Sequence, residues 1–223
     1  MRGFLIDMHC HTLDHSYDGK VPARDIVAKL HSLGFSGLVI TDHNYVWPDE
    51  ELAQLRAECG LGESFLILSG QEVRTAMNGI TYGDLLVYGL KESLPDDTSP
   101  LQIFSLIEHS AAFCTAPHPA ISHIGFGDHL GNFPVIAAET WNGRYGKDNS
   151  AKALLLTEEH QLPQVGGSDA YYEREIGGGG TLFDAMPRSL ADIQRFIRED
   201  RCRPWQPSKF SAAAKRWFGI AKR

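Results

Sequence analysis

Short apolar runs alternate along the chain with longer segments in which apolar residues recur every three or four positions. Runs typical of buried strands lie near residues 4–6, 37–40, 65–68, 85–88, 113–115, 135–138, 164–165 and 181–183. Segments with helical spacing lie near residues 22–34, 48–59, 101–112, 152–161 and 189–198. Repeated strand and helix units favour parallel strands covered by helices, so the pattern predicts an α/β fold with functional residues at the carboxyl ends of its strands.

Residues that favour turns and helix ends support this division. Pro22 is placed to begin the first helix and Gly34 to end it, while Ser189 is placed to cap the last helix. Asn78-Gly79 predicts a turn. The four consecutive glycines at 177–180 lack the Lys-Ser/Thr ending of a nucleotide-binding loop, so we predict a flexible loop at the rim of the fold.

The composition fits one large domain with an acidic body. The chain has 223 residues, of which 43% are hydrophobic and 22% are charged. Residues 201–223 carry seven Lys or Arg side chains and no acidic side chain, so the preceding residues are more acidic than the net charge of −7 indicates. An acidic body argues against binding of duplex nucleic acid, which needs a basic face.

The four cysteines are scattered along the chain without CxxC spacing. The amino terminus lacks the pattern of a secretory signal, and no apolar run approaches the roughly 18 residues needed to cross a bilayer. We therefore expect a soluble cytoplasmic protein with reduced thiols and no transmembrane segment.

Five short polar motifs follow predicted strands and contain the residue types that bind divalent metal ions. They are Asp7-Met8-His9-Cys10-His11, Thr41-Asp42-His43-Asn44, Gly70-Gln71-Glu72-Val73, Ala116-Pro117-His118-Pro119 and Gly167-Ser168-Asp169-Ala170. His9 and His11 share one face of an extended strand and can close on one ion. A single His-x-His pair is often an ordinary pair of histidines, but five motifs at strand ends favour a multinuclear metal site.

The order and spacing of the motifs resemble those of the polymerase and histidinol phosphatase (PHP) family. The resemblance rests on the runs His9-Cys10-His11-Thr12, Asp18-Gly19, Ile40-Thr41-Asp42-His43-Asn44, Asn142-Gly143-Arg144 and Gly167-Ser168-Asp169-Ala170. It implies a distorted TIM-like (β/α)7 barrel that binds two or three divalent ions (Zn, Mn or Fe) and is used mostly for phosphoester hydrolysis. We expect this PHP domain over residues 1–200, followed by a basic amphipathic tail over residues 201–223.

The resemblance also implies a ligand set for each ion. The first ion would be held by His9, His11, Glu72 and Asp169, the second by Glu72, Asp84 and His118, and the third by Asp18, His43 and Tyr171. Asp84 and Tyr171 depart from the family pattern, which has histidine at both positions. A carboxylate still binds these metals, whereas a phenol with a pKa near 10 is a poorer ligand than imidazole.

The ligand set predicts hydrolysis of a small phosphorylated metabolite or a nucleotide by attack of a metal-bound hydroxide, without a protein nucleophile. His43 is the candidate proton donor to the leaving group, and Asp42 is expected to orient a ligand histidine. Arg144 is the best candidate to bind phosphate oxygens, with Arg74 and Lys147 behind it.

Two other functions remain open on the sequence alone. Ile121 stands where the family often has an arginine after its His-Pro pair. Without this phosphate-binding side chain, hydrolysis of a non-phosphate bond is an alternative. The departures at Asp84 and Tyr171 also fit a non-catalytic or regulatory metal-binding module.

The tail places Phe210, Ala214, Trp217, Phe218 and Ala221 at helical spacing. We expect this apolar stripe to pack against the barrel, because most amphipathic helices face their own core. The alternatives are a membrane surface or a partner that the sequence does not identify.

Overall fold

The computed structural model describes residues 3–207, in which nine strands form one sheet. The strands are β1 (Phe4–Asp7), β2 (Gly37–Ile40), β3 (Leu66–Met77), β4 (Ile80–Tyr88), β5 (Phe113–Ala116), β6 (Ala137–Asn142), β7 (Gln164–Gly167), β8 (Gly180–Phe183) and β9 (Cys202–Trp205). Their order across the sheet is β7-β6-β5-β4-β3-β2-β1-β8-β9. The α-helices are α1 (Ala23–Ser32), α2 (Asp49–Cys59), α3 (Pro100–Glu108), α4 (Gly146–Glu159) and α5 (Leu190–Arg198).

The two ends of this sheet curl toward each other. Thr181 of β8 joins them, because its hydroxyl accepts a hydrogen bond from the Gly166 amide (3.0 Å) and donates one to the Gly166 carbonyl (2.8 Å) of β7. The sheet is therefore a nearly closed barrel, and the expected α/β barrel fold is confirmed.

The expectation of parallel strands is wrong for part of the barrel. β1, β2 and β3 are parallel to one another, as are β5, β6 and β7, but β4 is antiparallel to both β3 and β5. β8 is antiparallel to β1 and to β9. The reason lies partly at Asn78-Gly79, where both residues have positive φ (55° and 76°) and form a tight hairpin turn that reverses the chain.

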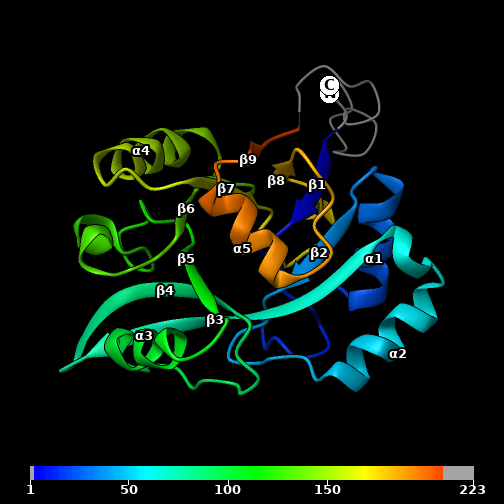
Figure 1. Ribbon diagram of the computed structural model, residues 1–223, viewed down its shortest axis with the longest axis horizontal. Coiled ribbons are helices and arrows are strands. Elements are labelled where there is room, and N and C mark those ends of the chain that lie inside the picture. Colours follow the sequence, from blue (N-terminus) through cyan, green and yellow to red (C-terminus); the bar gives the residue numbers. More distant parts are fainter. Residues whose placement is uncertain (1–2, 208–223) are drawn as a thin grey trace, which may run out of the picture.

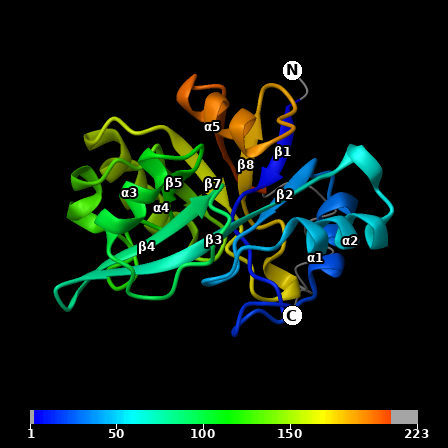
Figure 2. The same cartoon turned by 60° about the horizontal axis from the view of Figure 1, so that its bottom comes forward.

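The helices cover the outside of the barrel and close one end of it. Figure 1 shows α1 and α2 together on one side, with α3 and α4 on the other. Figure 2 shows α5 at the end of the molecule where β1 begins. Ile193, Phe196 and Ile197 of α5 pack against buried residues of the barrel interior, including Ile6 and Phe183. Apolar packing thus fills this end, and the polar motifs lie beyond the other ends of β1, β2 and β7.

The glycine run at 177–180 is not the flexible loop that its composition predicted. Gly179 and Gly180 are buried, and a Cβ added to Gly179 would lie 2.0 Å from the carbonyl oxygen of Gly167. The Trp141 indole also donates a hydrogen bond to the Gly178 carbonyl (2.9 Å). Gly179 is required for close backbone packing beside β7, because a side chain there would separate the two segments.

The sheet continues into the segment that was expected to be a separate tail. Cys202–Trp205 form β9, which pairs with β8, so the barrel includes residues beyond position 200. The stripe from Phe210 to Ala221 lies outside the described residues. Within residues 3–207, no helix is long and apolar enough to cross a membrane.

Candidate metal centre

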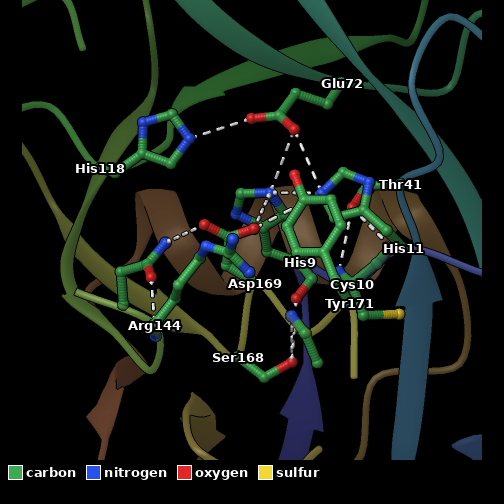
Figure 3. Close-up of polar contacts among 12 residues, drawn as sticks. His9, Cys10, His11, Thr41, Glu72, His118, Arg144, Ser168, Asp169 and Tyr171 are labelled. Atoms are coloured by element: carbon green, nitrogen blue, oxygen red, sulfur yellow. Dashed lines mark hydrogen bonds and ion pairs between the residues drawn. The ribbon is translucent and has the colours of Figure 1, made fainter. Parts of the chain in front are cut away.

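Four histidines and two carboxylates from distant parts of the chain meet at one end of the barrel. His9 and His11 follow β1, His43 follows β2, His118 follows β5 and Asp169 follows β7, while Glu72 lies within β3. All except the partly buried His43 are buried, and Figure 3 shows His9, His11 and His118 grouped around Glu72. His118 and Asp169 adopt positive φ (30° and 51°), a strained backbone conformation that is common at functional sites.

Glu72 is the centre of this group. Its Oε2 lies 3.2 Å from Nε2 of His11, 3.4 Å from Nε2 of His9 and 3.5 Å from Nδ1 of His43. Its Oε1 lies 3.0 Å from Nε2 of His118. Burial alone would raise the pKa of Glu72, but the surrounding histidines hold it well below its usual range. An ionised carboxylate with three imidazoles near one oxygen and one imidazole near the other is suited to bridge two cations.

The outer hydrogen bonds of His9 and His11 turn their Nε2 atoms inward. Nδ1 of His9 lies 3.1 Å from Oε1 of Glu139, and Nδ1 of His11 lies 3.2 Å from Oγ of Ser16. The Glu139 carboxylate can only accept, so it favours hydrogen on Nδ1 of His9 and leaves the Nε2 lone pair of that ring free. The two Nε2 atoms are only 3.2 Å apart, close enough to share one proton or to bind one metal ion together.

A buried oxygen without a partner gives a second sign that cations fit this site. Among residues 3–207, Asp169 Oδ1 has no hydrogen-bond partner, although it lies 3.5 Å from Nε2 of His11 and 3.6 Å from Nε2 of His9. Three overlapping groups place ligand atoms within 4.8 Å of one another: His9–Glu72–His118, His9–His11–Asp169 and His11–His43–Glu72. Imidazole and carboxylate ligands in this number suit Zn, Mn or Fe.

Asp84 lies in β4 at the edge of the group and is paired with an arginine. Its Oδ1 accepts a hydrogen bond from Nε of Arg74 (3.2 Å). Burial, together with the charge of Glu72, raises the pKa of Asp84 to about 6. Ligation by Asp84 stays a prediction, and Arg74 is held by this carboxylate rather than directed freely at the centre.

Asp18, His43 and Tyr171 are brought together as expected for a third position. Nε2 of His43 lies 3.1 Å from the Tyr171 hydroxyl and 3.5 Å from Oδ2 of Asp18. The Tyr171 ring stacks on His11 with centroids 4.3 Å apart. Burial, followed by the charges of Glu72 and Asp169, raises the pKa of Tyr171 far above its ordinary value. A protonated phenol is a weak ligand, so the third ion stays a prediction.

Asp42 does not contact a ligand histidine, which corrects our interpretation of this residue. Its carboxylate accepts hydrogen bonds from the Thr12 amide (2.6 Å), the Thr12 hydroxyl (2.7 Å) and the Trp47 indole (2.7 Å). In a strand, neighbouring side chains point to opposite faces, so Asp42 is directed away from the side that His43 faces. Asp42 fixes the backbone beside His11 and is not placed for catalysis.

The three candidate phosphate-binding residues lie in different surroundings. The Arg144 guanidinium stacks over the Tyr171 ring at 4.4 Å, and its Nη1 donates to Oε2 of Glu175 (3.3 Å). Lys147 instead lines a separate cavity of about 360 Å³ beside Trp141 and Trp205. Arg144 is therefore the candidate with a defined orientation beside the ligands.

Sequence reasoning missed the residues that support the ligands. Oε2 of Glu139 accepts hydrogen bonds from the His118 amide and from Nδ2 of Asn142, both at 3.0 Å. Asn142 also donates to Oδ2 of Asp169 (3.1 Å). Glu139 follows an apolar run in the sequence just as the ligands do, and this signal could have marked it as part of the site.

Replacing Glu139 by glutamine is expected to weaken metal binding about 10- to 100-fold, the usual cost of losing a carboxylate behind a ligand histidine. The amide removes the negative charge that faces His9 Nδ1. Metal dissociation constants measured by competition with a chelator dye test this expectation. Glu108→Gln, at an exposed position of α3, is the control. Equal affinities in both variants would show that Glu139 does not support the centre.

Comparison with known proteins identifies the same family as the sequence motifs. Residues 7–221 match the family model described as PHP domain. No curated protein sequence matches the chain significantly. The chain belongs to the PHP domain family, and this membership, with the group of histidines and carboxylates, supports a metal-dependent hydrolase.

Solved structures share the fold at low sequence identity. PsfC from Pseudomonas syringae has a TM-score of 0.69 and 18% identity, with 97% of this chain and 95% of that chain covered. A two-domain protein from Bacteroides vulgatus containing a predicted PHP-like metal-dependent phosphoesterase has a TM-score of 0.65 and 18% identity, with 92% and 65% covered. An amidohydrolase from Chromobacterium violaceum with bound sulfate has a TM-score of 0.61 and 15% identity, with 92% and 98% covered.

Proposed function

We propose that the protein hydrolyses esters of small phosphorylated molecules and uses at least two divalent ions. The observation that carries the proposal is the pair of inward-facing Nε2 atoms of His9 and His11, which lie beside Glu72 and the unpartnered Oδ1 of Asp169. His9, His11, Glu72, His118 and Asp169 would hold the ions. When bound, divalent ions act as Lewis acids that lower the pKa of water toward neutrality and offset charge on phosphoryl oxygens.

The side chains around the ligands supply binding and proton transfer. Arg144 would bind phosphoryl oxygens, since its guanidinium is held by Tyr171 and Glu175 and still reaches solvent. His43 remains the candidate to donate a proton to the leaving group, because it is the most exposed histidine of the group, at 13% of its side-chain surface.

The thiols and the charge of the protein bear on its cellular compartment and on the kind of substrate it binds. All four cysteines are free, which supports a reducing, cytoplasmic compartment. The acidic composition supports a small substrate rather than duplex nucleic acid.

Protein reconstituted with Mn²⁺ or Zn²⁺ is expected to release phosphate from an aryl phosphate, a nucleotide or a sugar phosphate. His9→Ala and Asp169→Ala should remove this activity, because each deletes a ligand. His109→Ala, at an exposed position after α3, should not change it. A fully metallated protein that is inert toward the phosphoester panel, including a duplex oligonucleotide, would refute the proposal.

A second candidate function is hydrolysis of a carbon–nitrogen or lactone bond. It is favoured by the buried, apolar Ile121 beyond the His-Pro pair, where no arginine is present to select phosphate, and by the fold shared with the amidohydrolase. Parallel assays with amides and lactones separate the two functions. A protein that retains fewer than two ions per chain would instead support a regulatory module.

A further inference from the structure

An aromatic side chain lies exposed at the mouth of the metal centre. Tyr17 belongs to the loop between β1 and α1, and it is 79% exposed, more than any other large hydrophobic side chain of residues 3–207. Its ring lies nearly parallel to the imidazole of His43, with centroids 5.1 Å apart and planes inclined by 22°. One face of the ring therefore covers a residue of the metal centre, and the exposure leaves the opposite face open to solvent.

The loop that carries Tyr17 is fixed by backbone hydrogen bonds. The Leu13 amide donates to the Val21 carbonyl (2.9 Å), and the Lys20 amide donates to the Tyr171 carbonyl (2.9 Å). Next to Tyr17, the Ser16 hydroxyl accepts a hydrogen bond from the His43 amide (3.0 Å). A loop held in this way keeps the Tyr17 backbone in place when a ligand binds, and such preorganisation strengthens binding.

The charges around Tyr17 are mixed. The carboxylates of Asp18, Asp96 and Glu72 and the guanidinium of Arg74 all act on its phenol. A surface with both signs of charge does not select a ligand by charge alone. The open face of the ring instead favours a flat, uncharged group, which binds by stacking.

We infer that Tyr17 is a stacking platform for an aromatic group of the substrate, and that the substrate is a phosphate ester carrying a ring such as a nucleobase. The inference rests on the proposed function, which places the phosphoryl group at the metal centre. Because only His43 separates Tyr17 from that centre, a short spacer must join phosphate and ring, as a sugar does in a nucleoside monophosphate. Tyr17 thus determines specificity and takes no part in bond breaking.

Adenosine 5′-monophosphate and ribose 5-phosphate provide a pair of substrates that share the phosphorylated sugar and differ at C1′, where one carries the base and the other a hydroxyl. The metal-reconstituted protein is expected to prefer the nucleotide by about tenfold or more in kcat/KM, as loss of one base–aromatic stack predicts. Tyr17→Ala should reduce this ratio to near one, while Tyr17→Phe should retain it. Leu13→Ala removes another exposed apolar side chain of the same loop and should leave the ratio unchanged.

Calorimetric binding of the two compounds to the same proteins separates this inference from the proposed function. If neither compound is hydrolysed but the nucleotide binds tighter and Tyr17→Ala removes the difference, the proposed function fails and the platform stands. The platform is refuted if the wild-type protein binds both compounds equally or binds neither. It is also refuted if the preference survives Tyr17→Ala, or if Leu13→Ala removes it as well.

Discussion

Glu72→Gln is expected to reduce bound metal from at least two ions per chain to less than one. It should also lower hydrolytic activity by more than about 100-fold, because loss of a residue that only supports a metal ligand already lowers activity by up to about 100-fold. Glutamine keeps the size of the side chain and removes its charge. The carboxylate of Glu72 is within 3.5 Å of a ring nitrogen of all four histidines, so one substitution affects every ligand group that contains it.

Elemental analysis after dialysis, combined with kcat on an aryl phosphate, measures both effects. Glu63→Gln, at an exposed position before β3, is the control because it makes the same chemical change away from the site. Retention of two ions by Glu72→Gln would show that this carboxylate is not the bridging ligand.

Gly179→Ala is expected to destabilise the fold by about 3 kcal/mol or more, at the upper end of the cost of overpacking. The added methyl group would lie 2.0 Å from the Gly167 carbonyl oxygen, and a backbone atom cannot move aside as a flexible side chain can. Because Gly167 precedes Asp169 by two residues, metal affinity should fall together with stability.

Denaturant unfolding of the metal-free protein measures this change in the free energy of unfolding. Gly60→Ala is the matched comparison, since Gly60 has φ of 65° but no atom within 4 Å of an added Cβ. Gly60→Ala should lower the free energy of unfolding by only about 1 kcal/mol, the penalty of a left-handed conformation for alanine. If both variants lost the same free energy of unfolding, the segment around Gly179 would have to move and accommodate the methyl group without strain.

The sequence was sufficient to find the histidines and carboxylates that meet at this end of the barrel, because each follows an apolar run and occurs in a short motif. His9 and His11 are two residues apart, so their common direction follows from strand geometry alone. Glu139 also follows an apolar run, but its contact with His9 spans 130 positions, and no local spacing shows which histidine it supports. Long-range hydrogen bonds of this kind depend on the closure of the barrel.

Strand direction and the glycine run show two other limits of a sequence pattern. An apolar run looks the same in a parallel and an antiparallel strand, so β8 could not be distinguished from the parallel strands. Glycines likewise serve mobile loops and close backbone contacts, and composition does not separate the two uses. Asp42 was misassigned because the residue beside a ligand histidine can support either that histidine or the adjacent backbone.

The three hydrogen bonds of Asp42 join two places on the chain that the ligand motifs do not connect. Thr12 immediately follows His11, and Trp47 immediately precedes Pro48, where the chain enters α2. A displacement of α2 would therefore shift Asp42 and, with it, the backbone that positions an imidazole of the centre. Substitutions on the outer side of the barrel near α2 can thus alter how firmly a metal ion is held, without touching any residue that contacts it.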